Sequence, residues 1–325
     1  MQLQIELAGT SAITPGRRVT TAEIVAELFP DRDPAKIIRK TGIDTRWFAD
    51  KNDTAADLGT RALREALDDA GMQAEELERI ILVTSGVGDL AFPATANLIC
   101  AGLGLQGSCD CFDINNACLG FLSAFDLAAR SVATGGGPVG IAVVELATRC
   151  MTPADTRPYL VFGDAVAGAV VRRAESGGML GSWLRNDGVA FGNVRLDNPV
   201  ITGKPESISF TATSDTIAEE AVSAIRTSAE AVLEQQDIGF EDIEWILPHQ
   251  PNGALFQLIV DTLGIPHEKI VPVVNEIGSS GAAAIPFSLA RLYQLHEVKA
   301  GDRILMVGVG GGISYGAILY EQPAA

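Results

Sequence analysis

Cys118 is the residue whose type and position point most directly to chemistry. It follows the run 112–114, which predicts a strand, and it begins an apolar helix predicted from Leu119 to about Arg130. Unpaired backbone N–H groups and the helix dipole at such a helix start favour a thiolate, the nucleophilic form of cysteine. A small core cysteine without a chemical role is the alternative, and for cysteines in general it is the more frequent one.

His249 is the second candidate because it directly follows a predicted strand. The strand 245–247 ends just before Pro248, and His249 opens the polar segment that ends at Asn252. Proteins of the α/β class place ligand-binding groups at the carboxyl ends of parallel strands. A neutral imidazole there can donate a hydrogen bond to a thioester oxygen or accept a proton. A histidine that only caps a turn is the alternative.

Glycine-rich turns supply the third kind of candidate. The segment Gly308–Gly312 ends the last long predicted strand, so its backbone N–H groups can approach a substrate closely and form half of an oxyanion hole. A nucleotide cradle is the alternative, but no G-x-G-x-x-G opens an early βαβ unit and no P-loop pattern occurs. The turn Phe162–Gly168 is predicted to be architectural, a tight connection between strands.

These residues must be positioned by helices and short apolar strands that alternate along the chain, a pattern typical of parallel sheet covered by helices. Thr54 opens a predicted helix that Gly71 ends, and acidic residues then lead into the strand 80–84. The second half repeats this order, with a helix over 217–235 and acidic residues before the strand 245–247. The repeated order predicts an internal duplication.

The later elements of the two halves also match. The segment 271–274 runs into the Gly278–Gly281 turn and an apolar helix, as 112–114 runs into Cys118 and its helix. The helices that follow Cys118 and Ser280 have almost no polar face, so both are expected between sheets. The prediction is an α/β fold of five layers, α/β/α/β/α, built from two duplicated halves at 1–173 and 174–325.

Composition restricts the class of partner. The chain has 325 residues, with 24 Lys and Arg against 41 Asp and Glu and a formal net charge of −17. That charge argues against nucleic acid or an anionic membrane surface as the main partner. The amino terminus lacks a targeting pattern, and no apolar run reaches the roughly 18 residues that span a bilayer. Five unevenly spaced cysteines without nearby histidines predict reduced thiols, no metal site and a cytoplasmic location.

Taken together, these segments resemble ketoacyl synthase III, the initiating condensing enzymes of the thiolase superfamily. The resemblance rests on an ordered set of motifs that spans nearly the whole chain. The motifs are Asn116-Ala117-Cys118-Leu119-Gly120, Phe162-Gly163-Asp164, His249-Gln250-Pro251-Asn252, Gly278-Ser279-Ser280-Gly281-Ala282-Ala283 and Gly310-Gly311-Gly312. The resemblance implies a thiolase-like five-layered fold, with the cysteine in the N-terminal half and the histidine and glycine-rich loop in the C-terminal half.

The resemblance also implies a ping-pong acyl transfer without a cofactor. Cys118 would take an acyl group from a CoA or acyl-carrier thioester, and the N–H groups of Cys118 and Gly311 would hold the oxyanion. His249 would then stabilise or deprotonate the second substrate. Members of this family are homodimers, and Phe92 matches a residue that reaches into the partner's acyl pocket.

One departure from the family concerns the second half of the reaction. Ser279 stands where the family usually has an asparagine, which together with the histidine donates hydrogen bonds to a malonyl thioester as it loses CO2. Loss of one such donor weakens stabilisation of the enolate by about 2.7–4 kcal/mol. Asn275 lies four residues earlier and would substitute only if the loop bends unusually.

A second departure concerns the donor. The family's carrier-protein patch is basic, but the segment 253–264 contains no Lys or Arg. The family's tryptophan that stacks on the CoA adenine is also missing, which leaves Arg39, Lys40 and Arg157 as candidate phosphate contacts. Asn252 is expected beside the substrate because it belongs to the His-Gln-x-Asn motif. These residues leave the choice between CoA and a carrier protein open.

Several functions fit these residues. The first is condensation with a malonyl-type acceptor, which gives a 3-oxoacyl product. The second is transfer without decarboxylation to an alcohol, an amine or a β-keto carbon in secondary metabolism, which Ser279 favours. A Cys–His thioesterase or peptidase is a third, although Asn116 replaces the first glycine of a G-x-C-x-G elbow. A non-catalytic subunit is the fourth, and the presence of both Cys118 and His249 argues against it.

Overall fold

Two sheets form the framework of the computed structural model, which describes residues 2–86, 88–203 and 207–324. The first sheet has five strands, in the order β1 (Ile5–Ile13), β7 (Ala165–Arg173), β6 (Val139–Glu145), β4 (Arg79–Val83) and β5 (Asp110–Ile114). The second has four, in the order β11 (Trp245–Pro248), β12 (Arg303–Gly310), β13 (Ser314–Glu321) and β8 (Gly178–Asn186).

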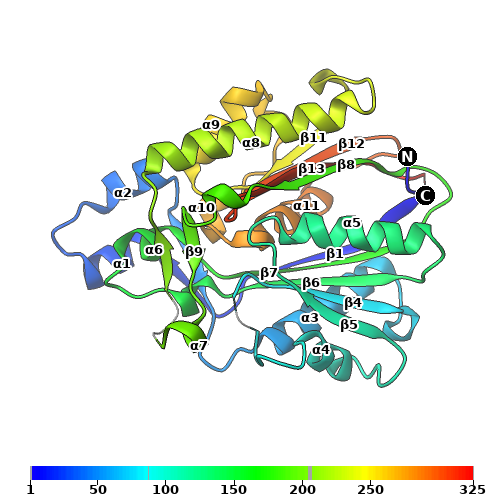
Figure 1. Ribbon diagram of the computed structural model, residues 1–325, viewed down its shortest axis with the longest axis horizontal. Coiled ribbons are helices and arrows are strands. Elements are labelled where there is room, and N and C mark those ends of the chain that lie inside the picture. Colours follow the sequence, from blue (N-terminus) through cyan, green and yellow to red (C-terminus); the bar gives the residue numbers. More distant parts are fainter. Residues whose placement is uncertain (1, 87, 204–206, 325) are drawn as a thin grey trace.

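Helices cover both sheets on both faces, and the result is five layers (Figure 1). The central layer holds α5 (Gly120–Ala133) and α11 (Ala284–Leu295). The outer layer on the first sheet holds α3 (Ala55–Ala70) and α4 (Ala96–Gly102), and the outer layer on the second holds α8 (Ser214–Glu234) and α9 (Gly253–Leu263). The predicted α/β/α/β/α fold is therefore confirmed.

Smaller elements lie around the ends of the sheets. Two small antiparallel sheets pair β2 (Arg17–Thr20) with β3 (Thr45–Phe48), and β9 (Val194–Leu196) with β10 (Ile208–Phe210); the second pair is called the β9–β10 hairpin. The short helices are α1 (Thr21–Leu28), α2 (Pro34–Thr41), α6 (Thr156–Val161), α7 (Pro199–Thr202) and α10 (Val274–Ile277). Single 3₁₀ turns occur at Ala74–Glu76, Ala147–Cys150, Gly188–Ala190, Phe240–Asp242, His267–Lys269 and Gly281–Ala283.

Apolar patterning explains why α5 and α11 are central. Phe121, Leu122 and Phe125 of α5 and Phe287 and Leu289 of α11 are fully buried, in a core cluster that includes strands of both sheets. A helix that is apolar all round must be covered on every side, so these two helices lie between the sheets. The outer helices are amphipathic and bury one face only.

The two halves repeat the predicted order of elements with one exception. The sequence α3, 3₁₀ turn, β4 of the first half matches α8, 3₁₀ turn, β11 of the second. The exception is the segment 271–274, where the sequence indicates a counterpart of β5. Only the bridge between Ile246 and Ile270 remains there, and the chain turns at once into α10.

The expectation of parallel sheets is correct only in part. Parallel pairing joins β4 to β5 and β6, and β11 to β12, whereas the other neighbours run antiparallel. For β12 and β13 the reason is the length of the connection, because residues 311–313 alone join them and a parallel return needs a longer crossover. The chain passes from the first sheet to the second between β7 and β8; the limits of the two halves, 1–173 and 174–325, stay a prediction.

Candidate active site

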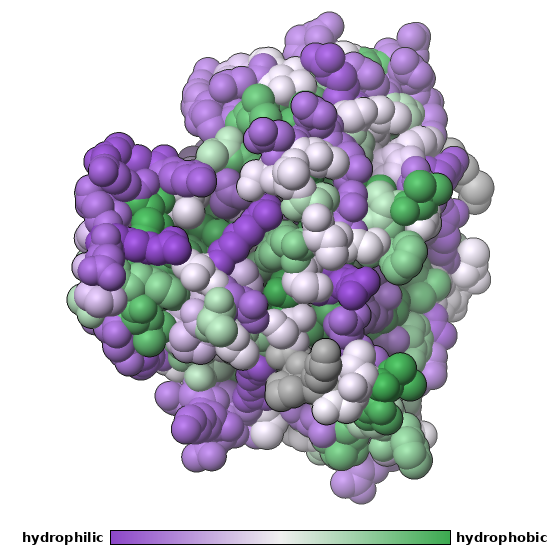
Figure 2. All heavy atoms as spheres, turned by 60° about the vertical axis from the view of Figure 1, so that its left-hand side comes forward, coloured by the Kyte–Doolittle hydropathy of each residue, from purple (hydrophilic) through white to green (hydrophobic). Residues whose placement is uncertain are grey.

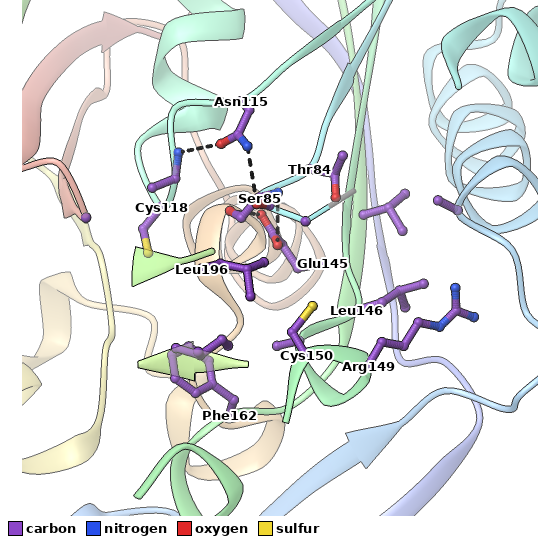
Figure 3. Close-up of a pocket in the computed structure, with 18 of the residues that line it drawn as sticks. Thr84, Ser85, Asn115, Cys118, Glu145, Leu146, Arg149, Cys150, Phe162 and Leu196 are labelled. Carbon is purple, nitrogen blue, oxygen red and sulfur yellow. Dashed lines mark hydrogen bonds between the residues drawn. The ribbon is translucent and has the colours of Figure 1, made fainter. Parts of the chain in front are cut away.

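A cavity of about 280 Å³ lies where strand ends of both sheets meet the β9–β10 hairpin, and Cys118 is in its wall (Figure 3). Its lining is mixed, with apolar side chains on some elements and polar or charged ones on others. The lining residues are Ala55, Thr84, Ser85, Gly86, Asp89, Asn115, Ala117, Cys118, Val144, Glu145, Leu146, Ala147, Arg149, Cys150, Phe162, Val194, Arg195, Leu196, Ile208, Gly281 and Gly311.

Cys118 is presented by a sharp turn between β5 and α5. Ala117 has a φ of 45°, a left-handed conformation that non-glycine residues rarely adopt, and α5 begins two residues after the cysteine. The end of β12 approaches closely from the other sheet, since a Cβ on Gly310 would lie 2.8 Å from the Cys118 nitrogen. Glycine is required at 310 for this approach, and it brings the N–H of Gly311 to the Cys118 sulfur.

The thiol of Cys118 is protonated in the resting protein, contrary to the expectation from its helix start. Burial, together with the nearby carboxylate of Glu145, raises its pKa to about 12. Hydrogen bonds from the N–H groups of Cys118 and Gly311 act in the opposite direction but are weaker than these two effects. The prediction of a resting thiolate is therefore wrong, because loss of hydration outweighs the helix end.

Alkylation of Cys118 by iodoacetamide should therefore rise about tenfold for each pH unit between about pH 7 and pH 9, without a plateau. The thiolate is the reactive form, and its fraction stays small throughout that range. The matched variant Glu145→Gln should react faster than wild type at about pH 8 because it removes a neighbouring negative charge. Peptide mapping at timed intervals gives both rates, and a plateau below about pH 8 would contradict the raised pKa.

Glu145 is a residue of the site that the sequence analysis did not single out. It ends β6, it is 4% exposed, and it lines the same cavity as Cys118. Its carboxylate accepts hydrogen bonds from the Ser85 hydroxyl at 2.7 Å and the Ser85 N–H at 3.3 Å (Figure 3), and a third from the Ala282 N–H at 3.2 Å. Burial raises its pKa to about 7, and these hydrogen bonds offset only part of that rise.

The raised pKa of Glu145 makes folding depend on pH in a defined direction. A carboxyl whose pKa rises from 4.5 to about 7 on folding favours the folded state at low pH, and that stability is lost as pH rises from about 4.5 to about 7. Glu145→Gln removes the effect. The unfolding free energy of this variant relative to wild type should increase by about 2–3 kcal/mol between about pH 5 and pH 9. Urea denaturation at both pH values measures this, and an equal difference at both would be inconsistent with a protonated resting carboxyl.

His249 is fixed by the strand that precedes it. The backbone N–H of His249 donates to the Val307 carbonyl at 2.8 Å, which continues the parallel pairing of β11 with β12. The side chain is 2% exposed, and among the described residues its Nδ1 has no hydrogen-bond partner. Burial lowers the pKa of the imidazole to about 4, so it is neutral near pH 7. A neutral imidazole with its proton on Nε2 is a hydrogen-bond donor, not a charge.

Ser279 lies in a segment that follows the cavity wall. Its N–H donates to the Val161 carbonyl at 2.9 Å and its carbonyl accepts from the Gly163 N–H at 3.0 Å, next to Phe162 in the wall. The serine is 3% exposed. Asn275 lies on α10 with its side chain exposed, and it is not among the residues that line the cavity. Its position does not support the suggestion that it substitutes for the asparagine.

Arg39, Lys40 and Asn252 lie together outside the cavity. A Cβ on Gly42, the C-cap of α2, would be 2.5 Å from the Cα of Gly253, the first residue of α9. This contact places the exposed Arg39 and Lys40, in the last turn of α2, near the start of α9. Asn252 caps α9, and its side-chain oxygen accepts from the Leu255 N–H at 3.0 Å. That bond gives Asn252 a structural role beside any contact with substrate.

Arg157 lies on α6, with its guanidinium 4.1 Å from the centre of the Phe210 ring. The face that includes α1, α2 and α6 is mainly hydrophilic, with smaller apolar patches (Figure 2).

Phe92 is 85% exposed and does not line the cavity of this single chain.

The turn at Phe162–Gly168 is only partly architectural. Asp164 is buried and accepts hydrogen bonds from the Thr148 hydroxyl and from the N–H groups of Thr148 and Ala49, which ties three segments together. Phe162, however, lines the cavity beside Leu196 (Figure 3). The turn follows α6 rather than a strand, so its first residue faces the site and not the sheet.

Neither a metal site nor a membrane span is found in the part of the chain that the structure describes. No group of three or more His, Cys, Asp or Glu side chains among residues 2–86, 88–203 and 207–324 is placed to hold a metal ion. Within the same ranges, none of the helices combines the length and the apolar character that crossing a membrane requires.

Comparisons with known proteins point to one family. The family model for 3-oxoacyl-[acyl-carrier-protein] synthase III matches residues 112–188, and the model for the C-terminal part of the same family matches 233–322. Among curated proteins, β-ketoacyl-[acyl-carrier-protein] synthase III of Neisseria meningitidis is 28% identical over 318 residues, which cover 97% of this chain and 98% of that protein.

Solved structures agree over almost the full length. The 3-oxoacyl-[acyl-carrier-protein] synthase III of Aquifex aeolicus is 30% identical, with a TM-score of 0.89 and coverage of 98% of this chain and 99% of its own. The priming β-ketosynthase of the R1128 polyketide pathway is 26% identical, with a TM-score of 0.88 and coverage of 99% and 98%.

Proposed function

Because the chain belongs to the 3-oxoacyl-[acyl-carrier-protein] synthase III family, whose members are acyl-transferring condensing enzymes, we propose that Cys118 takes an acyl group from a thioester and condenses it with a malonyl-type acceptor. The observation that carries this proposal is the convergence of two N–H groups, those of Cys118 and Gly311, on the cysteine sulfur in the cavity wall. Paired donors at a nucleophile are suited to hold the oxyanion of acyl transfer.

The loading step is a thioester exchange. The Cys118 sulfur bonds to the acyl carbonyl carbon, the bond from that carbon to the donor's sulfur breaks, and the thiol proton leaves with the donor as its free thiol. The carbonyl oxygen carries negative charge between these events, where the Cys118 and Gly311 N–H groups stabilise it. The raised pKa of Cys118 means that the proton must leave during attack rather than before it.

The condensation step releases CO2. The malonyl carboxylate leaves as CO2. The electron pair of the broken bond stays on the malonyl α-carbon and forms the new bond from that carbon to the acyl carbonyl carbon. The Cys118 sulfur is the leaving group and takes up a proton. His249 is buried and neutral and is not among the residues that line the cavity of the single chain. By the family resemblance, its role would be to donate a hydrogen bond to the malonyl thioester oxygen.

Acyl transfer without decarboxylation, to an alcohol, an amine or a β-keto carbon, is the second candidate because of Ser279. A serine hydroxyl is shorter than an asparagine amide, and the exposed Asn275 does not replace it. With one hydrogen-bond donor fewer for the enolate, the rate of decarboxylation falls more than the rate of Cys118 acylation does. A Cys–His thioesterase is a further alternative, in which water is the acceptor.

Ser279→Asn tests the role of this position. If the enzyme decarboxylates a malonyl thioester, the restored amide should raise the rate of CO2 release by up to about 100-fold, the effect of one oxyanion donor. The measurement is CO2 release from malonyl-CoA and from malonyl-carrier protein by enzyme pre-acylated on Cys118. Ser280→Asn, at the adjacent buried serine, is the matched control. A lower rate in Ser279→Asn would show instead that the serine has its own function.

For the donor we propose acyl-CoA, and for the assembly a homodimer. Helix α9 (Gly253–Leu263) has no basic side chain for an acidic carrier protein, whereas Arg39 and Lys40 are exposed near its start. Phe92 is 85% exposed in the single chain, which leaves it free to contact a second copy. No cofactor is required for either half of the reaction.

A further inference from the structure

Glu145 is the charged group of the cavity wall whose environment is least complete. Asp89 accepts from the N–H groups of Ala55 and Ala56 at 2.9 and 2.7 Å, and Arg195 pairs with Asp197 at 3.1 Å. Arg149 donates to the Asp53 carbonyl. Glu145 receives only neutral donors, and within the described residues it has no ion-pair partner.

The two carboxylate oxygens of Glu145 are not equally satisfied. Oε1 accepts from the Ser85 hydroxyl at 2.7 Å and the Ala282 N–H at 3.2 Å. Oε2 accepts only the Ser85 N–H, at 3.3 Å. An ionised carboxylate has room for about four donors, so Oε2 retains acceptor capacity. Because the side chain is 4% exposed and lines the cavity, a further donor has to come from what the cavity holds.

The uncharged polar groups of the cavity and Glu145 lie at the ends of three neighbouring strands, whereas most of the apolar groups lie on other elements; Arg195 of β9 and Arg149 after β6 are charged residues among the apolar ones. Thr84, Ser85, Asn115 and Glu145 are at the ends of β4, β5 and β6. The remaining wall is largely apolar and comes from β6, the turn after it, the α6–β7 turn and the β9–β10 hairpin: Val144, Leu146, Phe162, Val194, Leu196 and Ile208. A cavity volume of about 280 Å³ suits a short acyl chain. The combination of apolar side chains with polar groups at the strand ends suits an acyl chain that carries a polar substituent.

We propose that the acyl group this enzyme loads on Cys118 is short and carries a hydrogen-bond donor, a hydroxyl or an ammonium, which Glu145 binds. The inference rests on the proposed function, since it concerns the acyl group in the first half-reaction. Glu145 would then set specificity rather than carry out the transfer. The raised pKa of its carboxyl supports this, because a buried carboxylate with only neutral donors and spare acceptor capacity is destabilised in its charged form.

Acyl-CoA sets with the same number of heavy atoms test the inference directly. One set places the variable group on the third carbon: butyryl, 3-hydroxypropionyl and 3-aminopropionyl. The other places it on the second: isobutyryl, lactoyl and alanyl. The readout is kcat/KM for acylation of Cys118, followed by intact mass. In at least one set, wild type should prefer the hydroxyl or ammonium member over the methyl member by about 10–100-fold, the range of a hydrogen bond to a charged group.

Two variants assign that preference to Glu145. Glu145→Leu should abolish it, whereas Glu145→Gln, which keeps an oxygen acceptor and the shape, should lose the preference for ammonium and keep much of that for hydroxyl. Ile208→Val, in the apolar wall, is the control whose substrate ratio should not change. Equal or faster loading of the methyl members by wild type, or a preference that survives in Glu145→Leu, would overturn the inference and leave the proposed function intact. If no acyl group of any set reaches Cys118, the proposed function fails and the inference with it.

Discussion

Cys118→Ala should abolish acyl-enzyme formation and reduce product formation by about 10⁵-fold or more, the scale seen when a covalent nucleophile is removed. The reason is chemical, since alanine has no atom that can take the acyl group from the donor. The variant should still fold, because residue 118 lies in a turn ahead of α5 and only its side chain is shortened. Incubation with a short acyl-CoA, intact mass and peptide mapping measure the effect.

A second cysteine of the same cavity provides the control. Cys150 also lines the cavity (Figure 3), but it is not the proposed nucleophile. Cys150→Ala should therefore be acylated on Cys118 at the wild-type rate. An acyl adduct that persists in Cys118→Ala and maps to Cys150 or Cys111 would refute the assignment of the nucleophile.

His249→Ala should separate the two half-reactions. Acylation of Cys118 should continue, because its oxyanion is held by backbone N–H groups of Cys118 and Gly311. Transfer to a malonyl thioester should fall by about 10²–10³-fold, the effect of one lost donor to a developing negative charge. Rapid-quench measurement of acyl loading and of product formation in the same preparation gives both rates.

The control for this variant is a histidine far from the site. His267 is exposed at the surface, so His267→Ala should leave both rates unchanged. His249→Asn should restore part of the transfer rate because an amide N–H also donates. Product formation at the wild-type rate in His249→Ala would remove this histidine from the mechanism.

Local signals in the sequence predict much of the fold. The helix expected after Thr54 is α3, with the Thr54 hydroxyl accepting from the Asp57 N–H and with Gly71 in the left-handed conformation at its end. The lack of a polar face correctly predicts that α5 and α11 lie between the sheets. The parallel or antiparallel direction of neighbouring strands is not predicted. It depends on connections such as 311–313, and the sequence gives the length of such a connection but not its path. The missing strand at 271–274 follows from α10 starting at Val274, which apolar residues alone do not reveal.

The candidate site divides in the same way. Cys118 and Gly311 lie together in the cavity wall, as the family resemblance implies. Glu145 ends an otherwise apolar strand, and a charged residue at the carboxyl end of a parallel strand is the signal that could have identified it. Glu145 raises the pKa of Cys118 in a site that is buried by both sheets. No local sequence pattern indicates that burial. The expectation of a resting thiolate is wrong for that reason.

The residues at the periphery show what motif matching leaves open. Arg39 and Lys40 come near α9 only through the close contact of Gly42 with Gly253. Asn252, matched through its motif, is engaged in capping α9. Such contacts join segments about 200 residues apart, so they follow from the tertiary fold and not from local sequence.

A single-turnover chase tests the central claim most directly. Enzyme loaded on Cys118 with a short acyl group, and freed from excess donor, is mixed with malonyl-CoA; acyl-enzyme mass, CO2 and product are followed together. We expect that each acyl group lost from Cys118 yields one CO2 and one 3-oxoacyl product. An acyl-enzyme that persists without CO2 release, or that decays only to free acid, would contradict it and point to transfer to another acceptor or to water.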